Sequence, residues 1–129
     1  MSYIDFMSVL HKSTKRDYLE RVNDSAFPKA RAAKLAKQWD YDYWDGDRRI
    51  NYGGYKYIEG RWEKVAREMI DHYSLPENPK ILDVGCGKGF LLFDFLKVMP
   101  ESEIFGIDIS EYAIQNSKEE IRKTIKEAI

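Results

Sequence analysis

The stretch KILDVGCGKGFLLFDFL, residues 80–96, joins two apolar runs through three alternating glycines and most constrains the fold. Ile81, Leu82 and Val84 form a short apolar run that is typical of a buried parallel strand. The second run, residues 90–99, is apolar nearly all round, which predicts a helix that is buried on more than one side. The sequence therefore predicts a strand that turns sharply at the glycines into a buried helix.

A second strand and helix are predicted to follow. Residues 103–108, EIFGID, have the character of a strand, and Ser110 is a suitable N-cap with Glu111 in the first turn. Beyond Ser110 the spacing predicts one helix to the end of the chain, with a stripe formed by Ile114, Ser117, Ile121, Ile125 and Ala128. The order strand, helix, strand, helix indicates an α/β fold that begins an open parallel sheet.

The chain before this unit is predicted to be mostly helical. Residues 61–73 have helical spacing, with an apolar stripe formed by Trp62, Val65, Ala66, Met69, Ile70 and Tyr73. A second helix is expected to open at Pro28 and to run to residue 39, and shorter helices are expected at residues 5–11 and 14–22. We therefore divide the chain into a helical and aromatic cap or lid, residues 1–60, and an α/β domain, residues 61–129.

The stretch between these helices, residues 40–62, is dense in Tyr, Trp, Asp and Gly and has no clean period. Its aspartates at positions 40, 42, 45 and 47 suggest a calcium loop, but the glycine offset is wrong and no glutamate closes the loop. Two interpretations stay open. The aromatic side chains either cover a core or form a lid over a ligand.

The composition fits one small domain without an evident charged partner. The 129 residues are 43% hydrophobic, enough for a packed core, and carry a net charge of -1. This balance favours neither nucleic acid nor a membrane as a partner. Cys86 is the single cysteine, so it has no partner for an internal disulfide, and we expect no metal site. With no signal peptide or apolar span in the sequence, we expect a soluble cytoplasmic protein.

The glycine turn and a later acid predict a ligand that contains a nucleoside. Such a turn lies at the C-terminal edge of a parallel sheet, and Gly85, Gly87 and Gly89 would let the main chain approach a ligand. Asp108 ends the second strand 23 residues after Gly85, where it is placed to accept hydrogen bonds from a ribose diol. We therefore expect the ribose to lie between the glycine turn and Asp108.

The spacing argues against a dinucleotide. A dinucleotide fold places its third glycine where this chain has Phe90, whereas here the glycine comes one residue early. Asp83, just before the glycines, would repel a pyrophosphate but would suit an ammonium group. A ligand with an amino-acid end and a nucleoside end fits better, and a nicotinamide-dependent enzyme is the less favoured alternative.

The segments DVGCGKG, residues 83–89, and IDI, residues 107–109, resemble the motifs of the class I S-adenosylmethionine-dependent methyltransferases. The resemblance covers residues 80–129 and implies an enzyme whose cofactor is S-adenosyl-L-methionine. Cys86 lies inside the first motif, where the family commonly has a small residue, and we interpret it as packing. The resemblance implies that the cofactor lies against Asp83, Gly85, Cys86, Gly87, Gly89, Asp108 and Ile109.

The stretch NYGGYKY, residues 51–57, and the helix after it resemble the N-terminal cap that many of these enzymes place over the cofactor. Tyr52, Tyr55, Tyr57 and Arg61 are therefore candidates for cofactor or substrate contacts. A core or surface role for each of them stays open. No catalytic residue is identified.

The predicted fold is an N-terminal helical cap followed by the first βαβα portion of a Rossmann-like open parallel sheet, and it is incomplete. The family's sheet has seven strands, and the third and later strands are expected to be absent here. The resemblance implies methyl transfer to a small-molecule acceptor in a full-length form, while this chain alone is expected to bind cofactor weakly or not at all. The alternative is a non-catalytic module that completes its sheet with a partner or with a second copy through an exposed sheet edge.

Overall fold

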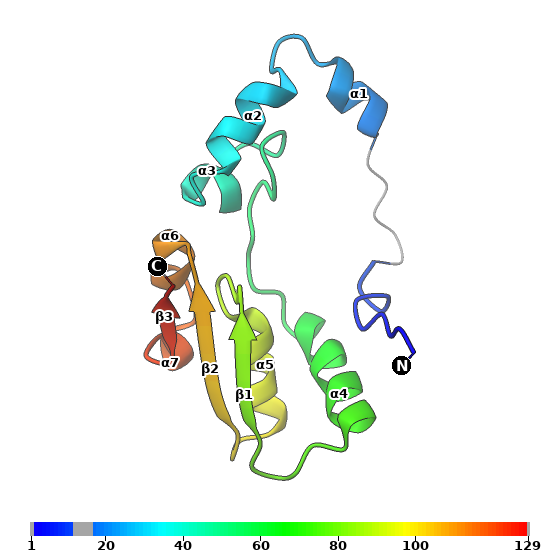
Figure 1. Cartoon of the computed structure of the whole chain (residues 1–129), viewed down its shortest axis with the longest axis vertical. Helices are drawn as coiled ribbons and strands as arrows, with labels where there is room; N and C mark the ends of the chain where they lie inside the picture. The colour runs from blue at the N-terminus through cyan, green and yellow to red at the C-terminus, as the bar shows by residue number, and fades with distance from the viewer. Residues whose placement is uncertain (1, 12–16, 129) are drawn as a thin grey trace.

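The structure, a computed structural model that describes residues 2–11 and 17–128, contains a parallel sheet with helices packed on one face (Figure 1). The sheet has the order β1-β2-β3, with β1 at Lys80–Val84, β2 at Glu103–Asp108 and β3 at Ile125–Glu127. The helices are α1 Tyr18–Asn23, α2 Lys29–Ala36, α3 Tyr41–Trp44, α4 Arg61–Tyr73, α5 Phe90–Val98, α6 Glu111–Gln115 and α7 Glu119–Arg122. The chain is thus an α/β fold with an incomplete open sheet, as the sequence predicts.

The central elements confirm the sequence predictions closely. β1 and β2 pair in parallel with Leu82 opposite Phe105, and α5 connects them. α4 spans the predicted residues, and its Val65 and Ala66 are fully buried. In Figure 1, α5 lies behind the sheet, and α4 packs against α5 to the right of β1.

The C-terminal segment differs from its prediction, because the expected long helix is two short helices followed by a strand. The Ser117 hydroxyl donates to the Ile114 carbonyl at 2.6 Å, a local bond that competes with a continuing helix. Ile125 then pairs with Gly106 in β3, so a third strand is present where the sequence predicted none. Ile121 and Ile125 are both buried, and their four-residue spacing suits a helix and a helix–strand junction equally well.

The hydrophobic core lies between the sheet and α5. Four buried residues make up its centre: Leu92, Ile104, Ile121 and Ile125. The partly buried residues packed against them are Ile81, Cys86, Phe93, Leu96 and Ile114. Leu92 and Ile121 are completely inaccessible to solvent. The segment after α6 is therefore part of the core and fixes where β3 begins.

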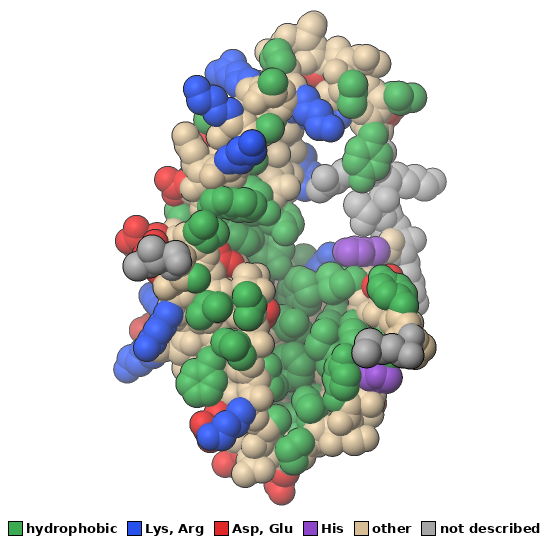
Figure 2. All heavy atoms as spheres, viewed as in Figure 1, with side chains coloured by type: hydrophobic (Ala, Val, Ile, Leu, Met, Phe, Trp, Pro, Cys, Tyr) green, Lys and Arg blue, Asp and Glu red, His purple; other side chains and the backbone are tan. Residues whose placement is uncertain are grey.

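The other face of the sheet is open, which corrects the expectation that β1 is a buried strand. Leu82, Val84 and Phe105 are 61%, 71% and 47% exposed. Figure 2 shows hydrophobic side chains gathered over this front face. In the described part of the chain, no strand pairs with the other edge of β1 either.

The N-terminal region is less regular than predicted. Residues 5–11 form hydrogen-bonded turns instead of a helix, with Ser8 N–H bonded to the Asp5 carbonyl. Of the helix expected at residues 14–22, only α1 is seen, and residues 14–16 lie outside the described residues. The predicted helix at Pro28 is confirmed as α2, but it ends at Ala36. Among the described residues, no helix is both long enough and apolar enough to cross a membrane.

Two leucine substitutions, one on each side of the sheet, test whether only one face is packed. Leu92→Ala leaves a cavity in the closed core and should lower the free energy of unfolding by about 2–5 kcal/mol. Leu82→Ala removes the same atoms from the open face and should change it by less than about 0.5 kcal/mol. Urea denaturation of both variants measures the difference, and equal losses would contradict the one-sided core.

Candidate active site

A cavity of about 380 Å³ lies at the carboxyl ends of β1 and β2, within the size range of ligand pockets. One wall consists of strand ends and the turn after β1, and the other consists of aromatic side chains from the segment that precedes α4. We call residues 39–57 the aromatic segment. The cavity is lined by Trp39, Tyr43, Trp44, Tyr52, Val84, Gly85, Ile107, Asp108, Ile109 and Ala128.

The three glycines of the turn after β1 all have positive φ, but they meet different surroundings. At Gly85, φ is 80° and an added Cβ would meet open space, so the main chain is uncovered beside the cavity. At Gly87, an added Cβ would come within 2.6 Å of the Trp44 ring. At Gly89, it would come within 2.6 Å of Ile125, so this glycine allows the start of β3 to approach the turn.

Asp108 is held firmly at the end of β2. One carboxylate oxygen accepts a hydrogen bond from Gly87 N–H at 2.6 Å, and the other accepts one from Ser110 N–H at 2.8 Å. The residue is only 7% exposed, yet it lines the cavity. Because each carboxylate oxygen has two acceptor sites, both oxygens keep capacity for hydroxyl groups of a ligand.

Trp44 connects the aromatic segment to the end of β2. Its indole N–H donates to the Ser110 hydroxyl at 2.9 Å, and the same hydroxyl accepts Ala113 N–H as the N-cap of α6. The Trp44 ring is buried and stacks on Tyr52 with 5.4 Å between the ring centroids and 9° between the planes. The aromatic wall is therefore fixed relative to Asp108.

A largely buried ion pair, with side-chain exposures of 5% for Lys88 and 20% for Asp45, holds the aromatic segment to the glycine turn and was missed by the sequence analysis. Lys88 is 4% exposed, and its ammonium group lies 2.8 and 2.6 Å from the two carboxylate oxygens of Asp45. It also donates to the Tyr55 carbonyl at 2.8 Å. The sequence does hint at this pair, because Lys88 lies between two glycines of a turn that should be buried, and four aspartates that could pair with it lie upstream.

The predicted site residues fall into two groups. Gly85, Asp108, Ile109 and the candidate Tyr52 line the cavity, whereas the other predicted residues do not. Gly87 lies directly behind Trp44, and Gly89 lies under β3. Asp83 is half-buried, and burial together with the nearby Asp108 raises the pKa of its carboxyl group.

The remaining predicted residues have structural contacts. Cys86 is half-buried against Gly106 and the core, in agreement with a packing role. Tyr55 stacks on Phe90 with 5.1 Å between the ring centroids. Arg61 is exposed at the start of α4.

Tyr57, Asp40 and Asp47 of the aromatic segment also make contacts within the chain. The Tyr57 hydroxyl donates to the buried Asp94 carboxylate at 2.6 Å, so this tyrosine joins the aromatic segment to α5. Asp40 caps α3, and Asp47 pairs with Arg49 at 2.6 Å. Among the described residues, no three His, Cys, Asp or Glu side chains are grouped as metal ligands.

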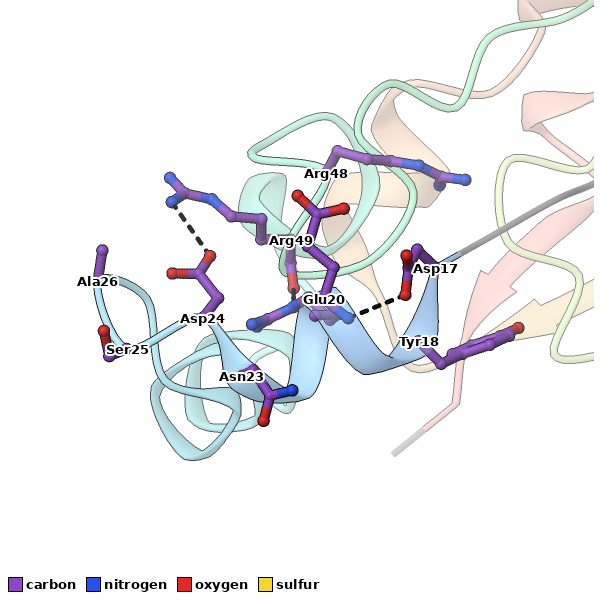
Figure 3. A pocket seen from close by; sticks show the side chains of 10 residues that line it. Asp17, Tyr18, Glu20, Asn23, Asp24, Ser25, Ala26, Arg48 and Arg49 are labelled. Atoms are coloured by element: carbon purple, nitrogen blue, oxygen red, sulfur yellow. Dashed lines mark hydrogen bonds and ion pairs between the residues drawn. The ribbon is translucent and has the colours of Figure 1, made fainter.

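A second, larger cavity of about 770 Å³ lies near α1, between residues 17–26 and the arginines at positions 48 and 49 (Figure 3). Some of its charged side chains are held by contacts within the chain. Arg49 lies 3.7 Å from Asp24, and Arg21 donates to the main-chain carbonyls of Arg49 and Phe27. Because none of the glycine turn lines this cavity, we place the candidate site at the strand ends.

Comparison with known proteins finds relatives for the part of the chain that carries this site. Residues 75–127 match a family described as "Methyltransferase domain". The chain is similar to an uncharacterized protein of Rickettsia prowazekii, with 42% identity over 40% of this chain and 19% of that protein. It is also similar to ribosomal RNA large subunit methyltransferase G of Shewanella sediminis, with 28% identity over 76% of this chain and 23% of that protein.

A solved structure with some likeness is coclaurine N-methyltransferase bound to N-methylheliamine and SAH. The TM-score is 0.38 at 14% identity, over 95% of this chain and 40% of that one. The chain spans about a fifth of the length of the curated relatives named above. Residues 75–127, which include β1, the glycine turn and β2, therefore resemble the family described as a methyltransferase domain.

Proposed function

We propose that the chain binds S-adenosyl-L-methionine at the carboxyl ends of β1 and β2, as part of an enzyme that methylates a small molecule. The observation that carries this proposal is the position of Asp108. Its carboxylate is fixed by two main-chain N–H groups on the wall of a cavity whose other wall is aromatic. A nucleoside has a ribose diol that can donate to the Asp108 carboxylate and a planar base that can pack on the apolar side chains of the cavity.

The residues present suit each part of this cofactor. Asp108 has free acceptor sites for the ribose hydroxyls, and Ile109 is 59% exposed at the same strand end, where it can contact the adenine. The uncovered main chain at Gly85 leaves room for the ligand. Aromatic faces attract cations, so the cavity-lining Tyr43 and Tyr52 suit a positively charged sulfonium group.

The bound cofactor would supply an activated methyl group on a sulfonium centre. The tasks of this chain are to orient that group through Asp108 and the glycine turn, and to exclude water with the aromatic segment. No described residue of the cavity is assigned as a general base. The proposal therefore assigns binding and alignment to this chain and leaves the base unassigned.

A small-molecule acceptor is favoured by the balanced charge of the chain, which supplies no broad basic surface for RNA. Ribosomal RNA is the competing acceptor, because one relative that covers most of this chain is named as a ribosomal RNA methyltransferase. The basic residues of α2 and its C-cap, Lys29, Arg31, Lys34 and Lys37, would be the first place to look for RNA contacts.

A second candidate function is a non-catalytic module that covers its sheet with a partner or a second copy. The open apolar face at Leu82, Val84 and Phe105 favours it. Light scattering on the 129-residue chain tests this candidate. A mass that rises with concentration would support it, and a monomer that binds cofactor would count against it.

The cofactor proposal is tested by calorimetric titration with S-adenosylhomocysteine. The sequence led us to expect weak binding or none, but because the described residues already form a cavity at the strand ends, we expect the wild-type chain to bind in the micromolar range. Asp108→Asn and Asp108→Ala should each weaken binding by about tenfold or more, because a charged acceptor for the ribose is lost. Glu103→Ala is the matched control, since it removes an acid from the exposed opposite end of β2. Unchanged affinity in folded Asp108 variants would overturn the proposed site.

The acceptor class is tested by transfer of a labelled methyl group from S-adenosyl-L-methionine. The purified protein is incubated with either a metabolite fraction of low molecular mass or ribosomal RNA. Because of the charge balance, we expect label in the metabolite fraction only. Label in the RNA would contradict the small-molecule proposal and would assign the RNA alternative.

The thiol of Cys86 is predicted to be inert at neutral pH. Burial, followed by the nearby charges of Asp83 and Asp108, raises the pKa of this thiol to about 12. Below that pH the reactive thiolate is scarce, so alkylation by iodoacetamide at pH 8 should be far slower in the folded chain than in urea. Equal rates in both conditions would show that Cys86 is accessible and ionised, which would reopen a nucleophilic role.

A further inference from the structure

The ammonium group of Lys88 uses its full hydrogen-bonding capacity on the aromatic segment. Two of its contacts are to the carboxylate oxygens of Asp45, and the third is to the Tyr55 carbonyl, ten residues farther along. An ammonium group has three donors, so none is left over. One side chain from the glycine turn thus holds two separate points of the aromatic segment.

Asp45 is equally saturated. In addition to Lys88, its carboxylate accepts Tyr55 N–H at 2.9 Å and the Tyr112 hydroxyl of α6 at 2.7 Å. Burial raises the pKa of this carboxyl group, but the hydrogen bonds from Lys88, Tyr112 and Tyr55 outweigh that effect and hold the pKa below its ordinary value. The charged form is therefore the form that the network stabilises.

Asp45 and Lys88 are each next in sequence to one partner of a close approach between the aromatic segment and the glycine turn. Asp45 follows Trp44, and Lys88 follows Gly87, where the Trp44 ring lies so close that no side chain would fit. Trp44 in turn reaches Ser110, next to the end of β2. Fixing Asp45 on Lys88 therefore fixes the aromatic wall on the turn and opposite Asp108.

From this geometry we infer that Asp45 and Lys88 are a pair of positioning residues that holds the aromatic segment over the glycine turn and so forms the cofactor cavity. The inference rests on the proposed function for the ligand that fills the cavity, but the placement of Trp44 is independent of it. A buried charge without its partner is strongly unfavourable, so loss of either residue should release the segment. Neither residue touches the reacting atoms.

The test uses Lys88→Met, Asp45→Asn and the double variant. Each single change should weaken S-adenosylhomocysteine binding by about tenfold, and the double variant should bind no worse than either single one, because the two residues act as a unit. Lys97→Met is the matched control. This lysine also joins α5 to the N-terminal region, through Glu59, but it lies outside the cavity, so its loss should leave binding unchanged.

A second readout separates this inference from the cofactor proposal. In a Trp39→Phe, Trp62→Phe background, Trp44 is the one remaining tryptophan, and acrylamide should quench its fluorescence more strongly after Lys88→Met or Asp45→Asn than after Lys97→Met. Circular dichroism confirms that the variants are folded. If Trp44 stays shielded in both pair variants, or if their effects on binding are additive, the inference is wrong. If Trp44 becomes exposed while the wild-type chain fails to bind S-adenosylhomocysteine, the inference stands and the cofactor proposal fails.

Discussion

The ion pair between Lys88 and Asp45 is the contact on which the candidate site depends. It joins the glycine turn after β1 to a segment that has little regular structure of its own, and it does so below the surface, with Lys88 only 4% exposed. Buried ion pairs seldom add much net stability, because removing both charges from water costs about as much as their attraction returns. What such a pair contributes is a defined geometry, because the two charges are stabilised only when the two segments adopt one relative position. Here that arrangement places Trp44 on Gly87 and opposite the Asp108 carboxylate.

The glycine turn serves the fold and the site together. Gly89 allows Ile121 and Ile125 to approach the turn, so the core and the start of β3 depend on the same loop that borders the cavity. Gly85 faces open space instead, and its main chain is available to a ligand. Only one face of the sheet is covered by a helix. α5 covers one face, and Leu82, Val84 and Phe105 remain exposed on the other. A chain that spans about a fifth of its relatives' length therefore builds a cavity without closing its sheet.

The sequence predicted the elements whose patterns are local. The strand before the glycines, α5, β2 and the Ser110 cap follow from apolar runs, prolines and a capping residue within a few positions of one another. β3 was missed because Ile121 and Ile125 have a spacing that fits a helix, and only the contact with Gly106 and Gly89 reveals the strand. Asp108 and Gly85 were placed at the cavity by motif spacing. The partners of the Asp45–Lys88 pair are 43 positions apart in the sequence, so no local pattern links them, and Trp44 could be assigned to the wall only once that pair was seen.

If the strand ends and the aromatic segment form one cofactor site, a crystal structure of the chain with S-adenosylhomocysteine will show it. We expect the ribose hydroxyls within hydrogen-bonding distance of the Asp108 carboxylate, the adenine against Ile109, and the Lys88–Asp45 pair intact. A ligand bound in the cavity near α1, or one bound at the strand ends with the aromatic segment detached from the glycine turn, would contradict this expectation.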